Sequence, residues 1–565
     1  MTQPQLLEGQ SGLPVDNPSK SYWHKEPSEK LLGHQTTKDL PHSADVVIVG
    51  SGITGSFAAH FLKEKRPELN VVMLEAREAC SGATGRNGGH CQPAIYASSA
   101  PHIASFELRN YLYLKSLEEE YSIPCDWHTT SGVHAFYSAD LFSIAQDIVA
   151  DLTENYPDLA ANVAVVTKGE GGSPAWLLEG ERKELTLNGL RIPNAEGAVV
   201  QWHAASLWPY KLVAFVLERL LAGNKDGQPG SFNLQTNTPA TGLTESEPPT
   251  PHNKPTWTVH TPRGTVSAPH VLLATNGYTS HLLPAFSDLL VPTRGQVSAL
   301  KPPEAPHSPA EPPLDIAHTF YIVGEPEAAF SREDYLVQRP PPSAELVFGG
   351  GRQHARARGI GVWDDGDIDE PVAWYLRGEL GSVVDLSLRE DPAHAHAHSS
   401  SAASIPAKDL AAAAAPPPNT AARKQDLEPT YQWTGIMGYS RDGHPFVGRV
   451  PPSLGGGGNS TPTSATSPTS PFSHSHSSND TSGGLWLCAG YTGHGMPNAT
   501  LCAKAVVDLM FPSTDEDGEP EDVDLPPEYE LSEKRVAVAR LRDEVAVVDK
   551  KGSLYMEFGA ARSGI

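Results

Sequence analysis

Three glycines and one acidic residue have the types and spacing of a nucleotide-binding turn. Gly50, Gly52 and Gly55 form the pattern Gly-x-Gly-x-x-Gly, and Glu75 follows Gly55 by twenty residues. Between a strand and a helix, such glycines allow a tight turn, a close approach of backbone N–H groups to a pyrophosphate, and close packing of the helix on the strand. An acid at this distance accepts hydrogen bonds from the adenosine ribose and repels a 2′-phosphate. The pattern therefore predicts a dinucleotide other than NADP.

A second glycine-rich segment follows at once. Residues 75–90 contain Gly82, Gly85, Gly88 and Gly89. A domain that binds only NAD has no need for such a segment here, whereas the isoalloxazine of FAD extends beyond the pyrophosphate and needs backbone that can lie close to it. We therefore predict that the cofactor is FAD.

A third group of glycines surrounds a histidine near the end of the chain. Gly493 and Gly495 flank His494, and Pro497 stands where the first residue of a helix is expected, before an amphipathic run to Met510. The N-terminus of this helix is expected to point at whatever the glycines contact, and its dipole favours negative charge there.

The elements that must position these groups are readable from the apolar pattern. Residues 45–49 and 71–74 are short apolar runs, and Ile53, Phe57 and Phe61 between them recur at helical spacing. This order predicts a βαβ unit with a parallel, buried sheet. Further along, the pattern predicts helices over 107–121 and 140–155, two strands around Arg263-Gly264, and a strand over 271–274.

The composition excludes several classes of function. Lys and Arg number 42 against 67 Asp and Glu, for a net charge of −25, which disfavours nucleic acid as a partner. The five cysteines include no C-x-x-C pair and no zinc-ligand spacing, so we expect reduced thiols and no metal site. No apolar run approaches the ~20 residues of a membrane helix, and neither a signal nor a transit peptide is visible. We expect a cytoplasmic protein without a membrane span.

Two stretches have low complexity. Residues 391–420 contain alternating histidines at 394–398, a serine run and five alanines, and residues 451–484 consist mostly of Gly, Ser, Thr and Pro. Such compositions do not bury enough apolar surface to offset their ordering entropy, so both are predicted to be disordered insertions. The histidine tract is interpreted as a solvated loop rather than a metal site.

The sequence resembles the D-amino-acid oxidase-like (DAO) superfamily of FAD-dependent oxidoreductases, most closely the branch of gamma-glutamylputrescine oxidase. Residues 82–89 read Gly-Ala-Thr-Gly-Arg-Asn-Gly-Gly, where the branch carries a similar stretch with Ser in place of Thr84. Four later segments are similar to family segments in the same order, so the resemblance covers most of residues 40–515. They are 232–243, 271–282, 433–448 and 489–510.

This resemblance implies an α/β fold with a Rossmann-like FAD-binding domain of the GR2 type interleaved with a mixed-sheet substrate domain. The expected FAD-binding domain comprises 40–110, 196–290 and 430–515, and the substrate domain 111–195 and 291–429. Residues 1–39 are expected to be an extension draped over the surface, and 516–565 a tail that includes a helix.

The resemblance also implies which residues contact FAD. Ala240 is expected near the adenine, residues 274–277 at the pyrophosphate, and residues 493–496 at the flavin pyrimidine edge. The predicted FAD-binding residues are Gly50, Ser51, Gly52, Ile53, Thr54, Gly55, Glu75, Ala76, Arg77, Gly82, Ala83, Thr84, Gly85, Arg86, Asn87, Gly88, Gly89, Ala240, Ala274, Thr275, Asn276, Gly277, Gly493, His494, Gly495 and Met496.

The function implied is oxidation of a carbon–nitrogen bond of an amine or amino acid, by hydride transfer to the flavin and hydrolysis of the imine. O2 or another electron acceptor is expected to reoxidise the flavin. Candidate catalytic residues are His90, Tyr335 and His494, and Arg352 is a candidate partner for a substrate carboxylate. Covalent attachment of the flavin to His90 is the less favoured reading. A tRNA-modifying flavoenzyme and an FAD protein with a partner-binding role remain alternatives.

Overall fold

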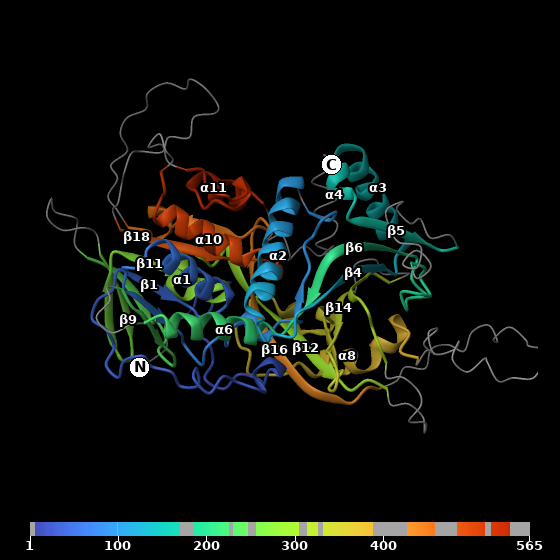
Figure 1. The fold of residues 1–565 in the computed structure, drawn as a ribbon, viewed down its shortest axis with the longest axis horizontal. Coiled ribbons are helices and arrows are strands. Elements are labelled where there is room, and N and C mark those ends of the chain that lie inside the picture. Colours follow the sequence, from blue (N-terminus) through green and yellow to red (C-terminus); the bar gives the residue numbers. More distant parts are fainter. Residues whose placement is uncertain are drawn as a thin grey trace, which may run out of the picture.

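The computed structural model describes residues 6–98, 100–169, 185–224, 230–246, 256–303, 314–325, 332–387, 426–457, 483–514 and 521–542. Two lobes lie side by side, each built on its own sheet, with the long helix α2 (Pro101–Tyr121) between them (Figure 1). The predicted insertion at 391–420 and its histidine tract lie outside the described residues, as do 458–482 of the second insertion.

The lobe on the left of Figure 1 contains the predicted βαβ unit. Within the described residues its main sheet has six strands, in the order β17-β18-β11-β1-β2-β7, and all neighbours except β17 and β18 pair in parallel. The strands are β1 (Val46–Val49), β2 (Val71–Leu74), β7 (Phe232–Gln235), β11 (His270–Leu273), β17 (Phe446–Arg449) and β18 (Gly484–Ala489).

Both faces of this sheet are covered, as a parallel sheet requires. Val46 and Ile48 share a core cluster with α1 (Ile53–Lys65), α6 (Pro209–Ala222) and α10 (Ala499–Met510). Val47 and Val49 share another with β9 (Trp257–Thr261) and β10 (Gly264–Ala268), which form a smaller sheet with β8 (Gly242–Glu245). Successive side chains of β1 therefore point to opposite faces of the main sheet, one covered by helices and the other by the smaller sheet. The strand–turn–helix–strand prediction and the two strands around Arg263-Gly264 are confirmed.

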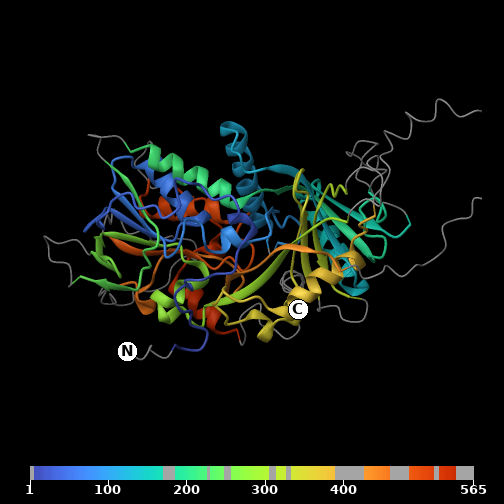
Figure 2. The same cartoon turned by 90° about the horizontal axis from the view of Figure 1, so that it is seen from below.

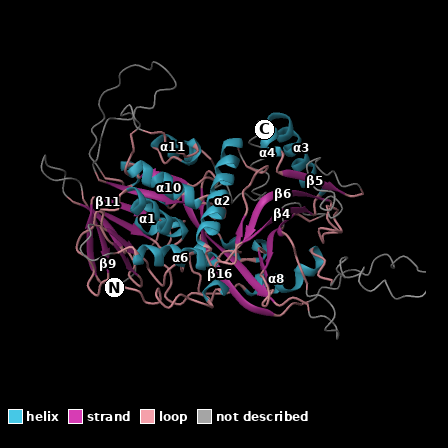
Figure 3. Cartoon of the chain, viewed as in Figure 1, coloured by secondary structure: helices cyan, strands magenta, loops and turns pink. Residues whose placement is uncertain are grey.

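The second lobe is a mixed sheet, shown as strands in Figure 3. Within the described residues its order is β16-β12-β15-β14-β13-β4-β6-β3, and β5 also pairs with β6. Only β13 and β4 pair in parallel. The strands are β3 (His90–Cys91), β4 (His128–Phe136), β5 (Val163–Thr167), β6 (Gly197–Ser206), β12 (Leu290–Leu300), β13 (Thr319–Val323), β14 (Glu333–Gln338), β15 (Leu346–Gly349) and β16 (Pro429–Ser440).

The predicted helices are present, but the predicted domain boundaries need adjustment. The predicted helices are present as α2 and α3 (Ala139–Asn155), and α8 (Glu370–Val383) packs on the sheet through Leu376 and Leu380. β6 and β16 begin at the expected boundaries 196 and 430 but pair within the mixed sheet rather than the parallel one. The chain thus crosses between lobes after these strands, not before them.

The N-terminal extension is not draped over the surface, so that expectation was wrong. Tyr22 and Trp23, in the short helix η1 (Tyr22–His24), are 1% and 0% exposed, and they pack against Trp208 and Trp433. Burial of two large aromatic side chains is a strong reason for this segment to enter the core. Seen from below, its blue trace runs along the centre of the molecule (Figure 2).

The C-terminal tail contains a helix, as expected. This is α11 (Glu533–Arg540), whose Arg535 forms two hydrogen bonds, of 2.8 and 2.9 Å, with Asp442. Within the described part of the chain, no helix combines the length and the apolar character needed to cross a membrane.

Candidate active site

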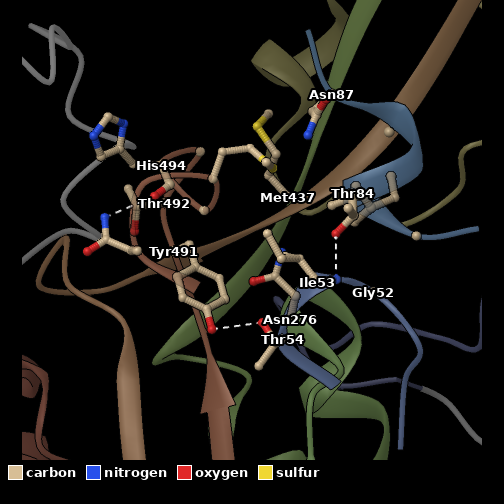
Figure 4. Close-up of a pocket in the computed structure, with 18 of the residues that line it drawn as sticks. Gly52, Ile53, Thr54, Thr84, Asn87, Asn276, Met437, Tyr491, Thr492 and His494 are labelled. Carbon is tan, nitrogen blue, oxygen red and sulfur yellow. Dashed lines mark hydrogen bonds between the residues drawn. The ribbon is translucent and has the colours of Figure 1, made fainter. Parts of the chain in front are cut away.

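One cavity brings the three glycine segments together. It has a volume of about 480 Å³, within the range of about 300–1,000 Å³ typical of small-molecule sites. Its walls come from the turn after β1, the segment after β2, the turn after β11, and the turn before α10, with the mixed sheet on the far side. Figure 4 shows part of this wall. The three candidate catalytic residues, His90, Tyr335 and His494, all line it.

The turn after β1 has the geometry of a phosphate site. Gly50 has φ +105°, and a Cβ there would lie 2.6 Å from the Ala274 carbonyl oxygen, so only glycine fits. Gly52 is the N-cap of α1 and offers no side chain to accept a hydrogen bond from the first turn. The backbone N–H of Ile53 instead donates to Thr84 Oγ1 at 3.1 Å (Figure 4). Gly52, Ile53 and Thr54, at the N-terminus of this helix, line the cavity, and a helix N-terminus favours an anion.

Glu75 is held at the edge of the cavity by its own turn. Its Oε2 accepts hydrogen bonds from the backbone N–H and the hydroxyl of Ser51, at 3.1 and 2.7 Å, and its Oε1 accepts from the Arg77 backbone N–H at 3.0 Å. A carboxylate has about four acceptor positions. One position therefore remains for a ribose hydroxyl, which fits the expected role.

The four glycines of the second glycine segment fall into two sets. Gly82 and Gly88 line the cavity, whereas Gly85 and Gly89 do not. A Cβ at Gly85 would lie 2.5 Å from the His24 ring, and one at Gly89 would lie 2.7 Å from the Trp23 ring. Gly89 therefore makes room for the N-terminal segment, and Gly85 makes room both for that segment and for the Cys80 carbonyl oxygen, which would lie 2.2 Å from its Cβ.

Two more of the predicted FAD-binding glycines lie behind the cavity wall. A Cβ at Gly55 would lie 1.9 Å from the Gly50 carbonyl oxygen, and one at Gly277 would lie 2.6 Å from the Met437 carbonyl oxygen. Both positions need glycine for close packing of backbone on backbone. All other predicted FAD-binding residues line the cavity.

The turn before α10 differs from expectation at its helix start. The helix begins at Ala499, two residues after Pro497, because Asn498 is the N-cap and the Gly495 carbonyl accepts from the N–H groups of Asn498 and Ala499. Gly493, His494, Gly495 and Met496 still line the cavity. The start of the helix therefore lies beside the cavity, as predicted, but its first turn begins two residues later than expected.

A buried carboxylate that sequence reasoning missed sets the charge of His494. Glu107 of α2 is 3% exposed, and its Oε2 lies 2.9 Å from His494 Nε2. Burial alone lowers the pKa of His494, but the charge and hydrogen bond of Glu107 outweigh it and raise the pKa above its ordinary value. A signal was present in the sequence, because Glu107 shares the apolar face of its helix with Ile103 and Tyr111.

A row of aromatic rings crosses the mixed sheet on the cavity side. Tyr335 of β14 lies opposite Tyr321 of β13, and Tyr321 lies opposite His134 of β4. All three line the cavity, and within the described residues neither tyrosine hydroxyl has a hydrogen-bond partner. These hydroxyls are therefore available to a ligand.

His90 packs edge-on against Tyr335, with ring centroids 5.2 Å apart. Burial lowers the pKa of His90 to about 3, and its Nε2 has no hydrogen-bond partner in the described part of the chain. The imidazole is therefore neutral, and a base this weak does not take a proton from an ammonium group. It can orient a ligand by hydrogen bonding.

Arg352 supplies a positive charge on the same side. Its Nη1 lies 3.3 Å from the Tyr439 hydroxyl, and its guanidinium lies 5.2 Å from the centroid of that ring. No carboxylate within the described ranges forms an ion pair with it. Arg352 thus presents a guanidinium to the cavity, in a region that also contains Glu333.

The turn that carries Arg352 rests on another buried carboxylate. Asp334 Oδ1 accepts from the Gly351 N–H at 2.8 Å, and Oδ2 accepts from the Tyr375 hydroxyl at 2.6 Å. A Cβ at Gly350 would lie 2.0 Å from Asp334 Oδ1, so the turn sits directly on the carboxylate. Burial raises the pKa of Asp334 to about 6. Asp334 is therefore placed to position Arg352.

These features fit FAD: a glycine cradle at a helix N-terminus, an acid with one free acceptor position, and a continuous cavity from that turn to the mixed sheet. A family model described as "FAD dependent oxidoreductase" (DAO) matches residues 45–509, which is most of the chain. The protein belongs to this family. It is an FAD-dependent oxidoreductase.

Solved structures support the fold of the DAO family. Glycine oxidase from Geobacillus kaustophilus superposes with a TM-score of 0.55 at 16% identity, covering 87% of this chain and 99% of that one. L-amino acid deaminase from Proteus vulgaris gives 0.52 at 14% identity, covering 90% and 99%. L-proline dehydrogenase from P. horikoshii gives 0.52 at 16% identity, covering 84% and 94%. At these identities the likeness establishes fold alone.

A curated relative matches over a short stretch. A probable malate:quinone oxidoreductase from Bordetella avium (strain 197N) is 40% identical over 60 residues, or 10% of this chain and 12% of that enzyme. The match spans about an eighth of that relative, so it says nothing about the substrate.

Proposed function

We propose that this protein oxidises the carbon–nitrogen bond of an amino acid or of an amine that carries a carboxylate. The observation that carries this proposal is Arg352, a guanidinium for which no ion pair is found within the described residues, in a cavity whose wall on this side also includes Tyr321, Tyr335, Tyr439 and Glu333. A guanidinium in such surroundings is suited to a carboxylate, which it can bind through two parallel hydrogen bonds.

The residues around Arg352 suit the rest of such a substrate. The hydroxyls of Tyr321 and Tyr335 and Nε2 of His90 offer hydrogen bonds without charge. Hydride transfer from the carbon needs the lone pair of the nitrogen, so we propose that the amine reacts in its neutral form and that these groups orient its nitrogen. FAD, when bound, supplies the two-electron acceptor, and water then hydrolyses the resulting imine.

The other side of the cavity suits a cofactor that gains negative charge on reduction. Glu107 favours the protonated form of His494, and the N-terminus of α10 lies beside it. A positive side chain and a helix dipole that face the same region both favour negative charge there. His494 is therefore proposed to act on the cofactor, and Arg352 on the substrate.

The test is anaerobic loss of the oxidised-flavin absorbance on addition of candidate substrates. The panel comprises neutral and acidic amino acids, simple amines and, because of the sequence likeness to the gamma-glutamylputrescine oxidase branch, gamma-glutamylated amines. We expect carboxylate-bearing compounds to reduce the flavin and Arg352→Met to raise their half-saturating concentration at least tenfold. Reduction by simple amines that is unchanged in the variant would contradict the proposal. Failure of every compound would favour a tRNA-modifying or partner-binding role.

A further inference from the structure

Residues 11–24, which we call the N-terminal strap, lie against the second glycine segment (residues 82–89). Leu13 and Pro14 of the strap line the FAD cavity itself. Ser21 and Trp23 are 3% and 0% exposed. The strap is therefore built into the site, although no glycine or charge pattern in it points to a cofactor.

The strap satisfies backbone carbonyls of the glycine segment. Ser21 Oγ donates to the Gly85 carbonyl at 2.7 Å, and Trp23 Nε1 donates to the Asn87 carbonyl at 2.6 Å. His24 Nε2 lies 3.2 Å from the Cys80 carbonyl, and burial, with the nearby Arg86 charge, lowers the pKa of His24 to about 4. Buried carbonyls need such partners, so these contacts hold the segment in one conformation.

The strap also contacts two arginines, Arg86 within this segment and Arg77 before it. Arg86 Nη2 donates to the Ser19 carbonyl at 2.7 Å, and Arg77 Nη1 donates to the Val15 carbonyl at 3.3 Å. Arg77 and Arg86 both line the cavity. The strap therefore contacts the carbonyls, the glycines and the charged side chains of the glycine segment and its surroundings.

We propose that the N-terminal strap is part of the FAD site: it positions residues 82–89 and closes the cavity beside them. Docking of the strap and binding of FAD then stabilise each other, because each orders the same segment. Ser21 and Trp23 are positioning residues for the cofactor. This inference does not depend on the proposed substrate.

The first test uses conservative variants of neighbouring strap residues in the full chain. Trp23→Phe and Ser21→Ala each remove one donor to the glycine segment. Tyr22→Phe is the matched control, because its hydroxyl bonds Glu345 at 3.0 Å and Ser343 at 3.3 Å, away from that segment. FAD release is followed by recovery of flavin fluorescence after dilution.

We expect FAD release about tenfold faster in Trp23→Phe and Ser21→Ala, in line with loss of one buried hydrogen bond, and within about twofold of wild type in Tyr22→Phe. Equal release rates in all three variants and the wild type would overturn the proposal. Release as fast in Tyr22→Phe as in Trp23→Phe would also overturn it, because the effect would then be general destabilisation.

The second test measures the reciprocal effect in the wild-type chain. Trypsin cleavage after Lys20, which is exposed within the strap, is followed by mass spectrometry in apo protein with and without added FAD. FAD should slow this cleavage at least fivefold but leave cleavage after Lys168, which is 55% exposed and in the other lobe, unchanged. Equal protection at both sites, or none at Lys20, would contradict the coupling.

Discussion

At the scale of single residues, buried carboxylates set the charge and position of the cavity's functional groups. Glu107 holds His494 and, through its Oε1, the Asn498 side chain at 2.9 Å. Asp334 holds the turn before Arg352. Neither carboxylate needs to touch a ligand to affect binding, because each acts through the residue it positions.

Replacing Glu107 with Gln should lower the pKa of His494. The carboxylate charge is lost while burial, which lowers the pKa, remains. A raised folded-state pKa adds stability that is present below the unfolded value of about 6.5 and is lost as pH rises through the folded pKa. The variant should therefore be more destabilised at pH 6 than at pH 8. Histidine NMR titration and chemical denaturation at both pH values measure this, with the exposed Glu119→Gln of the same helix as control.

Replacing Asp334 with Asn should change the pH dependence of stability. Because the folded pKa of Asp334 is about 6, above its ordinary value of 3.8, the folded state holds a proton that the unfolded state releases between these values. Wild-type stability should thus decline from about pH 4 to pH 6 through this group, and the variant should lack that decline. Denaturant titrations across this range test the sign. A steeper decline in the variant would be contrary to expectation.

The same variant should weaken binding of carboxylate ligands about tenfold, because the Arg352 turn loses its charged support. Perturbation of the flavin spectrum by a simple carboxylic acid measures this affinity. Asp315→Asn, an exposed position before β13, is the control. Weaker carboxylate binding with unchanged affinity for neutral amines would identify a positioning role.

At the scale of elements, the parallel sheet tolerates the long insertion because its flanking strands are already paired. β17 and β18 are antiparallel neighbours, with Arg449 opposite Trp486, and the Val450 N–H donates to the Leu485 carbonyl at 2.8 Å. These contacts bring the two ends of the insertion close together. We therefore expect the pairing to persist without the sequence between them.

Replacing residues 458–482 with a short Gly-Ser bridge should therefore leave FAD content unchanged and the melting temperature within a few degrees. The entropy of closing a loop between two paired strands changes only slowly with the length of the loop. Flavin absorbance per chain and thermal unfolding check both expectations. A colourless or aggregated product would assign a structural role to the insertion.

At the scale of the whole molecule, one buried carboxylate joins three distant segments. Asp365, which is 1% exposed, forms ion pairs with Arg77 at 2.8 Å and Arg86 at 3.2 Å, and its backbone carbonyl accepts from the Ser19 N–H. Burial is the main cause that lowers the pKa of Arg86 to about 10. The glycine segment after β2, the segment before α8 and the N-terminal strap therefore meet at Asp365.

Asp365→Asn should destabilise the protein by about 3–5 kcal/mol, because it leaves two buried guanidinium groups without their shared carboxylate. FAD content should fall as well, since Arg77 and Arg86 line the cavity. Denaturant unfolding and flavin absorbance measure the two effects. The exposed Asp367→Asn is the control. An equal loss of stability and FAD content in both variants would argue against a special role of Asp365 in joining these segments.

The sequence by itself determined the features that depend on near neighbours in the chain. The turn at Gly50, the parallel βαβ unit and the segment before α10 follow from glycine spacing and apolar periodicity, which act over a few residues. Family resemblance then identified FAD and most of the cavity wall. The start of α10 differed by two residues, because Asn498 is the N-cap and its backbone, with φ −123°, is not helical.

Only the tertiary structure decided which distant residues meet. Glu107 and His494 are separated by 387 residues, and Ser19 lies far in sequence from Asp365. Part of the reason for glycine at Gly85 and Gly89 was also hidden, because the His24 and Trp23 rings that need the space belong to the N-terminal strap. A local pattern shows that a position needs a small residue or a buried charge. It does not show which distant group the fold brings there, because that depends on how whole elements pack.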